Sequence, residues 1–214
     1  MLSPSDVTAV IVTRGDVDIQ PVLDSLIFDN VEVWDNSSVK QDQMTYGRVL
    51  AAMRAPTEVI YSQDDDLIHS HENQRRILEA YDEERMTGCM WPEWSAGAYE
   101  QGIENGYDDL VFPGSGSISH RDTWLDAIDL YLDSYPRDDF FRLWSDTLIG
   151  VIAPTTQLDL RFEILPVAAN GERMANLPDA VALKTEAITR GRKIAASERG
   201  TAGHRGSHFD QGAI

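Results

Sequence analysis

Three short apolar runs constrain the fold of this 214-residue chain more than any other feature. Residues 7–13 (VTAVIVT) form a continuous run rich in β-branched side chains, and shorter runs follow at 31–34 and 58–62. Runs of this kind suit strands that are buried on both faces of a parallel sheet. The segments between them, 22–27 and 46–54, carry apolar residues at helical spacing. This alternation predicts an α/β fold with a mostly parallel sheet and helices on both faces.

The later part of the chain predicts a less regular pattern. Helices are expected over 71–81, 122–131 and 138–152, and alternating polarity predicts a strand over 158–165. Residues 88–120 show little periodicity, which is typical of long functional loops. The aromatic residues of that segment could stack on a sugar or could belong to the core: Trp91, Trp94, Tyr99 and Tyr107.

The charge of the chain argues against general binding of nucleic acids. With 18 basic and 36 acidic residues, the formal net charge is −18, whereas a phosphate-backbone binder needs a basic surface. Residues 184–214 hold six bases and three acids, so residues 1–183 carry −21. We therefore expect one domain over 1–183 and a basic, Gly-rich segment over 184–214. That segment is either a solvated tail or a flexible cover that closes over an anionic ligand.

Localisation signals are sparse. No basic region precedes the first apolar run, so no signal peptide is predicted, and no run reaches the roughly 18 apolar residues of a membrane span. Cys89 is the single cysteine, which excludes an internal disulfide and fits a reducing compartment. A cytoplasmic protein without a membrane span is the expectation.

Each of the three predicted strands ends in a cluster of polar residues, at 13–15, 35–37 and 64–66. In open α/β sheets the ligand site lies beyond the carboxyl ends of the strands. If the strands are parallel, the three clusters should therefore meet at one edge of the sheet.

Three consecutive aspartates form the last of these clusters. Like charges so close together raise one another's pKa unless a cation intervenes, and carboxylates suit Mg²⁺ or Mn²⁺. In an extended chain Asp64 and Asp66 would share a face while Asp65 points elsewhere. The alternative is a solvated acidic turn. His69 and His71, which follow the cluster, are expected to face solvent.

The ordered segments VTAVIVTRG, VEVWDNSS and YGRVLAAMRAPTEVIYSQDDDL together resemble the nucleotide-binding half of a GT-A glycosyltransferase, whose fold is Rossmann-like. The nearest likenesses are the family-2-type and exostosin-like enzymes, and the resemblance covers about residues 7–81. A DxD motif alone is a weak signal, but the ordered set is moderately specific. The resemblance divides the domain into a nucleotide-binding half (about 1–87) and an acceptor half (about 88–183).

The resemblance also implies roles for individual residues. The first strand end would contact the nucleotide base, and Asp35 would bind the uracil or ribose. Asp64 would bind the ribose or donor sugar, and Asp66 would bind Mn²⁺ or Mg²⁺ together with Asp64. A late histidine, either His204 or His208, would complete the metal shell. The full set assigned to the nucleotide sugar is Thr13, Arg14, Gly15, Asp35, Asn36, Arg48, Asp64 and Asp65.

The segment PRDDFFRL at 136–143 is similar to the acidic pair that opens a late helix in inverting GT-A enzymes. By that likeness Asp139 is the general base and Asp138 its orienting neighbour. Family-2 enzymes usually show Glu-Asp here, and Asp146 is a competing candidate for the base. A helix-capping role for the pair is the alternative.

These features predict a metal-dependent transferase that moves a sugar from a nucleoside diphosphate, UDP by family frequency, to a hydroxyl acceptor of unknown class with inversion. One rival is a nucleotidyltransferase or sugar-nucleotide pyrophosphorylase, although that class places a Gly-rich, basic signature after the first strand. The other is a non-catalytic acidic module that binds metal.

Overall fold

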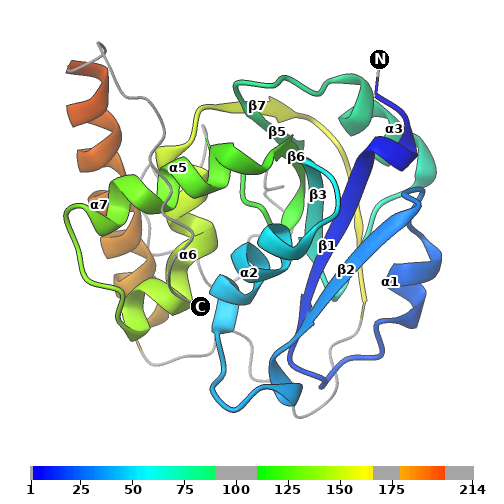
Figure 1. Cartoon of the computed structure of the whole chain (residues 1–214), viewed down its shortest axis with the longest axis horizontal. Helices are drawn as coiled ribbons and strands as arrows, with labels where there is room; N and C mark the ends of the chain where they lie inside the picture. Colours follow the sequence, from blue (N-terminus) through cyan, green and yellow to red (C-terminus); the bar gives the residue numbers. More distant parts are fainter. Residues whose placement is uncertain (1, 90–109, 166–178, 201–214) are drawn as a thin grey trace.

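The computed structural model describes residues 2–89, 110–165 and 179–200 (Figure 1). Before residue 90 it contains η1 (Pro4–Asp6), β1 (Val7–Thr13), α1 (Gln20–Asp24), β2 (Asn30–Asp35), η2 (Asn36–Ser38), η3 (Met44–Tyr46), α2 (Gly47–Arg54), β3 (Val59–Asp64), β4 (Leu67–Ile68), α3 (His71–Glu79) and β5 (Met86–Cys89). After residue 109 it contains β6 (Ser115–His120), α5 (Arg121–Leu132), α6 (Asp139–Ile152), β7 (Thr155–Leu158), β8 (Glu163–Ile164) and α7 (Ala180–Gly200).

Within the described residues, six strands form one sheet in the order β2-β1-β3-β6-β5-β7. β1 lies between β2 and β3 and is parallel to both. β6 lies between β3 and β5 and is antiparallel to both, whereas β5 and β7 are parallel. The expected α/β class with a mostly parallel sheet is therefore confirmed, with β6 as the antiparallel insertion.

Helices cover both faces of the sheet, as expected (Figure 1). The alternation of side chains along a strand sends Val10 and Ile60 to one face, where they pack with residues of α2, α5, α6 and α7. Val7 and Tyr61 face the other side, where α3 and the segment after α1 cover them. Burial of such apolar side chains stabilises the sheet by about 1.5–3 kcal/mol each.

One prediction for the later chain is wrong, and a second is contradicted only at β6. The expected strand over 158–165 is not continuous, because β7 ends at Leu158 and β8 holds only Glu163–Ile164. Leu160 and Phe162 are nevertheless buried on the α3 side of the sheet, so the alternating pattern reflected burial rather than strand pairing. The expected irregular segment 88–120 contains β6, and its residues 90–109, with all four aromatic residues named above, lie outside the described residues.

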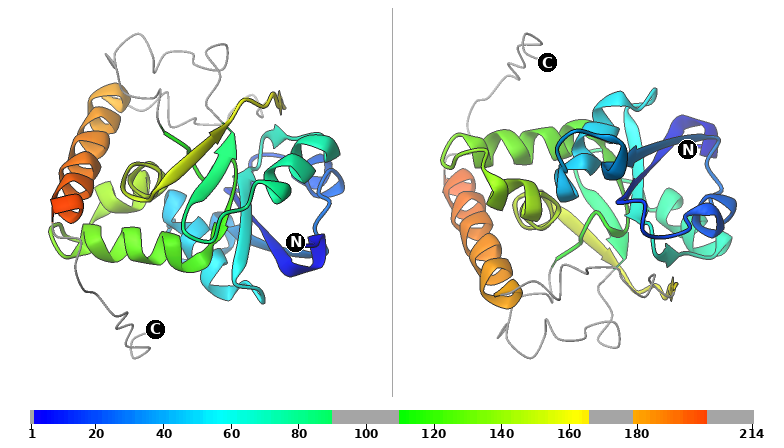
Figure 2. Two further views of the ribbon diagram at one scale, coloured as in Figure 1. Left: turned by 90° about the horizontal axis from the view of Figure 1, so that it is seen from above. Right: turned by 90° about the horizontal axis from the view of Figure 1, so that it is seen from below.

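The expected boundary after residue 183 is also wrong, because it falls inside α7 (Figure 2). Ala187 and Ile194 of this helix join the same core cluster as Leu148 of α6. Residues 184–200 are thus helical and packed on the domain. Residues 201–214 lie outside the described part of the chain. No helix in that part is both long enough and apolar enough to cross a bilayer.

His69 does not face solvent as predicted, whereas His71 does. The His69 side chain is fully buried, and its ring packs at a tilt against Phe162. Its Nε2 lies 2.9 Å from the carbonyl oxygen of Ser115 in β6. Burial lowers the pKa of His69 to about 4, so the ring is neutral near pH 7 and Nε2 donates to that carbonyl. Gly116 makes this approach possible, because its φ is +93° and a Cβ there would collide with the His69 ring.

Gly116→Ala should therefore lower the free energy of unfolding by about 3 kcal/mol, through backbone strain and the clash with His69. Urea denaturation of the purified variant measures this loss. Ser117→Ala is the matched control on the same strand, because among the described residues the Ser117 hydroxyl has one long hydrogen bond, 3.5 Å to the Pro113 carbonyl. We expect the control to cost less than about 1 kcal/mol, and equal losses in the two variants would contradict the close approach.

Candidate functional site

The carboxyl ends of β1, β2 and β3 meet at one edge of the sheet, as their parallel order requires. Thr13 is the register partner of Asp35 on one side, and Val12 is the partner of Asp64 on the other. The loop after β1 contacts the loop after β2, since a Cβ on Gly15 would lie 2.8 Å from the hydroxyl of Ser37. Gly15 has a φ of +77°, which favours glycine at this turn. We call this region the strand-end site.

The first two strand ends are shaped by short side-chain hydrogen bonds. The backbone N–H of Gly15 donates to the Thr13 hydroxyl oxygen at 3.0 Å. Asp35 accepts from the backbone N–H and the hydroxyl of Ser37, at 2.8 and 2.6 Å, and thereby caps η2. Arg14 forms an exposed ion pair with Asp16 at 3.2 Å. The edge of the sheet where the sequence predicted a nucleotide therefore holds Thr13, Arg14, Gly15 and Asp35.

Asn36 has a different position from the one expected for a ligand contact. Its side chain is buried and bonds three groups within its own loop and strand. The amide oxygen accepts from Trp34 Nε1 at 2.9 Å and from the Gln43 backbone N–H at 3.0 Å, and the amide nitrogen donates to the Met44 carbonyl at 3.1 Å. Asn36 thus fixes the loop that carries Met44, whose φ of 53° is unusual for a non-glycine residue.

The three aspartates do not continue as an extended strand. β3 ends at Asp64, and residues 65 and 66 form a turn into β4. The extended conformation from which a shared face for Asp64 and Asp66 was predicted is therefore wrong at residues 65 and 66. Asp64 forms an ion pair with Arg48, while Asp65 accepts a hydrogen bond from the Thr13 side chain. Asp66 is half-buried, and its carbonyl accepts from the Leu165 N–H at 2.7 Å.

The electrostatics of the strand-end site indicate an excess of negative charge. Burial is the main cause that raises the pKa of Asp65 to about 6, with Asp64 and Asp16 adding repulsion. Asp146, from the middle of α6, joins the site: burial raises its pKa, and Asp64 raises it further, while the charges of Arg48 and Lys184 act in the opposite direction. Lys184 of α7 is 9% exposed and lies over the Phe112 ring at 4.6 Å.

The three candidate bases on α6 lie in different environments. The Asp138 carboxylate accepts from the Phe141 N–H at 2.9 Å and is the N-cap of the helix. The Asp139 side chain is 79% exposed and pairs with Arg142. Asp146 lies seven residues, or about two turns, after Asp139 on the same side of α6, which is about 10 Å along the helix axis. Asp146, the competing candidate, is thus the carboxylate that α6 brings within electrostatic reach of Asp64.

The acidic turn suits a hard cation whose shell is completed by a ligand. In the described ranges, no three His, Cys, Asp or Glu side chains are arranged to hold a metal ion by themselves. Mg²⁺ and similar ions are often bound by one or two protein carboxylates plus substrate phosphates, and the excess of carboxylates around Asp64 fits that mode. His204 and His208, the predicted histidine ligands, lie outside the described residues.

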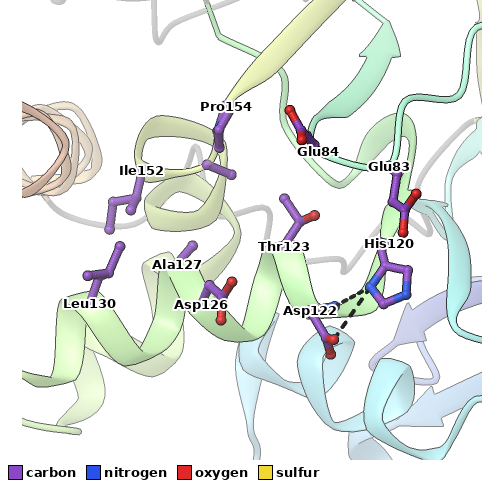
Figure 3. A pocket seen from close by; sticks show the side chains of 11 residues that line it. Glu83, Glu84, His120, Asp122, Thr123, Asp126, Ala127, Leu130, Ile152 and Pro154 are labelled. Atoms are coloured by element: carbon purple, nitrogen blue, oxygen red, sulfur yellow. Dashed lines mark hydrogen bonds and ion pairs between the residues drawn. The ribbon is translucent and has the colours of Figure 1, made fainter. Parts of the chain in front are cut away.

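A pocket of about 370 Å³ opens at the opposite edge of the sheet (Figure 3). Its floor contains apolar residues of α5 and of the end of α6, and its rim carries Glu83, Glu84 and Asp126. His120 lies at this rim, 3.6 Å from the Asp122 carboxylate and 3.7 Å from Glu58. Because His120 pairs with Val59 at the start of β3, the pocket is remote from Asp64, and its carboxylates would repel the phosphates of a nucleotide.

Comparisons with known proteins identify no family. No protein-family model matches the sequence, and a search of curated proteins gives no match. Among solved structures, A197 from STIV is similar over 78% of this chain and 97% of its own, with 13% identity and a TM-score of 0.42. A functional assignment therefore depends on the chemistry of the strand-end site.

The raised pKa of Asp65 predicts how stability depends on pH. Its folded value of about 6 exceeds the ordinary 3.8, so between these values the folded state binds more protons and the Asp65 contribution to stability falls as pH rises. Asp65→Asn removes the buried charge and should raise the free energy of unfolding at pH 7.5 by up to about 3 kcal/mol. At pH 4.5 the gain should fall to about 1 kcal/mol, because the unfolded carboxyl is still largely ionised there while the folded one is protonated.

Urea denaturation at the two pH values tests this expectation. Asp29→Asn, an exposed substitution just before β2, is the control and should change stability by less than about 0.5 kcal/mol at either pH. A gain for Asp65→Asn that is the same at both pH values would contradict the assigned burial of the charge.

Proposed function

We propose that this protein is a metal-dependent glycosyltransferase that moves a sugar from a nucleoside diphosphate sugar to a hydroxyl acceptor. The observation that carries the proposal is the convergence of three parallel strand ends, with Thr13, Asp35 and Asp64, on one edge of the sheet. In open α/β sheets this is the edge at which nucleotides bind. Asp146 of α6 lies within electrostatic reach of Asp64. A UDP-sugar is the first donor to test, and the buried thiol of Cys89, which donates to the Leu160 carbonyl, is consistent with a cytoplasmic setting.

Donor binding would use the two loops that touch at Gly15 and Ser37. Asp35 has one carboxylate oxygen engaged by Ser37, and its second oxygen can accept from a ribose hydroxyl or a base N–H. Arg14 offers a guanidinium beside it. The buried Thr13, whose hydroxyl bonds the Gly15 N–H and the Asp65 carboxylate, holds the first strand end in place. The absence of a side chain on Gly15 keeps this surface open to a flat base.

The aspartate turn would hold the diphosphate through a divalent cation. Asp64 and Asp66 are the protein ligands we assign, because Asp64 ends β3, Asp66 lies in the turn that follows, and both carry hard oxygen donors. Bound there, Mn²⁺ or Mg²⁺ would offset the charge that develops on the leaving diphosphate. Lys184 adds a positive charge near the same edge, from the helix α7 rather than from a flexible tail.

Asp146 is the residue we assign as general base. Its raised pKa favours proton acceptance near neutral pH better than that of an exposed aspartate. The Asp146 carboxylate would take the proton of the acceptor hydroxyl as its oxygen bonds to the anomeric carbon. The bond from that carbon to the phosphate oxygen breaks, and its electron pair leaves with the nucleoside diphosphate. Attack opposite the leaving group inverts the anomeric centre.

Calorimetric titration with Mn²⁺ and UDP tests donor binding. We expect UDP to bind only with the cation present, and Asp66→Asn to weaken the Mn²⁺-dependent binding at least about tenfold, because one carboxylate ligand is lost. Asp29→Asn is the matched control and should bind like the wild type. Mn²⁺ binding without UDP binding would favour a non-catalytic module, and release or consumption of pyrophosphate would favour a nucleotidyltransferase.

Hydrolysis of a UDP-sugar panel, with water in place of the acceptor, tests the base. Asp146→Asn should slow hydrolysis about 10²–10⁴-fold while changing the affinity for Mn²⁺ and UDP less than threefold. The mutant amide keeps an oxygen that can accept from the Thr147 N–H, as Asp146 does at 2.6 Å. Asp139→Asn should retain hydrolysis within about twofold, because its side chain is solvated. Slow hydrolysis by Asp139→Asn with nearly normal hydrolysis by Asp146→Asn would instead assign the general base to Asp139.

A further inference from the structure

Arg48, expected from the sequence to contact the nucleotide sugar, is instead buried beneath the strand-end site. It is the second residue of α2, and its side chain is only 3% exposed. One guanidinium nitrogen, Nη1, donates to the Ser62 hydroxyl at 2.8 Å and to the Gln63 carbonyl at 3.0 Å. The other, Nη2, donates to the Asp64 carboxylate. A ligand at the sheet edge therefore meets Asp64 before it can meet Arg48.

The Arg48 guanidinium binds the Asp64 carboxylate on one side, and the Gly114 backbone packs against the carboxylate on another side. The Asp64 N–H donates to the Gly114 carbonyl at 2.7 Å. A Cβ on Gly114 would collide with the carboxylate. Asp64 still keeps 35% of its side chain exposed. Its carboxylate is thus fixed in direction while one side faces outward, which is the arrangement a ligand-binding carboxylate needs.

Arg48 also has a second consequence for the site. Its positive charge acts on Asp65 and on Asp146, so one buried cation lies among three carboxylates from two different elements. Its Nε is buried without a hydrogen-bond partner among the described residues. Buried donors normally have partners. Because Nε has none in the described part of the chain while Nη1 and Nη2 are both bonded, the bonds of Nη1 and Nη2 set the orientation of the guanidinium.

We propose that Arg48 is a positioning residue, which acts through Asp64 by anchoring its carboxylate in the direction that faces the donor's cation and sugar. This inference rests on the proposed function, since it specifies how one of the assigned ligands is held. It changes the expected role of Arg48 from contact with the nucleotide sugar to control of the residue that makes the contact. The planar, forked guanidinium is required, because a lysine ammonium cannot span Ser62 and Asp64 in a fixed geometry.

The test compares Arg48→Lys with Arg54→Gln. Arg54 lies on the same helix and stacks on Trp34 at 4.4 Å, so its loss controls for removal of a guanidinium from α2. We expect Arg48→Lys to weaken Mn²⁺-dependent UDP binding by at least about tenfold, as a small misplacement of a ligand can do. Arg54→Gln should stay within about twofold. In an Asp64→Asn background, Arg48→Lys should cause no further loss, because both act through the same carboxylate.

The outcomes separate the two proposals. Wild-type protein that binds no UDP in the presence of Mn²⁺ would contradict the proposed function and this inference together. If the wild type binds UDP and Arg48→Lys binds it with an affinity within twofold of the wild type, this inference alone would be contradicted. An additive loss in the double variant would also overturn it, since Arg48 would then act independently of Asp64.

A measurement without ligand guards against misfolding of the Arg48 variant. NMR of the arginine Nη groups reports rotation about the Cζ–Nε bond of the guanidinium. Arg85 and Arg190 are also bonded through two nitrogens, so the Arg48 signal is identified by its disappearance in Arg48→Lys. We expect slowed rotation of the Arg48 guanidinium in the wild type and rotation at least about tenfold faster in Asp64→Asn, because an anchored fork must break its bonds to turn. Arg54→Gln should leave that signal in place. Fast rotation of the Arg48 guanidinium in the wild type would overturn the inference.

Discussion

The parallel pairing of β1 with β2 and β3 is the constraint on which the strand-end site depends. Parallel strands end on the same edge, so Thr13, Asp35 and Asp64 become neighbours although the sequence separates them by some 50 residues. The segments that contain α1 and α2 return the chain to the starts of β2 and β3, and α2 and the residues after α1 cover opposite faces of the sheet. A site built this way is carried by paired backbone rather than by loops alone, which favours a fixed geometry.

The early half of the fold could be predicted because its strands are apolar and β-branched. The run at Val7–Thr13 became a strand of those bounds. β6 was missed for a physical reason: its serines at 115, 117 and 119 are all buried, and a polar run gives no hydrophobic period to detect. Residues 184–200 were predicted to belong to a basic, Gly-rich tail from their charge and glycine content. Neither property reports the apolar side chains that α7 packs on the core.

The candidate site was predictable in its location and less so in its details. Polar clusters at strand ends indicated where Thr13, Asp35 and the aspartates would lie. The sequence does not show that the chain turns after Asp64, that Asn36 holds its own loop, or that Arg48 is buried. Each of these depends on contacts between segments distant in sequence. The proximity of Asp146 to Asp64 likewise follows from how α6 packs, for which a single sequence carries no signal.

The insertion of β6 between β3 and β5 has a consequence for how the chain acquires its fold. β6 pairs with β3 across more than 50 residues of intervening chain, and β5 and β7 can join the sheet only through it. Closing so long a loop costs entropy before any strand contact is gained, so assembly should be slow compared with that of a helical bundle. An isolated N-terminal half would expose β3 as an unpaired edge, open to association with other chains.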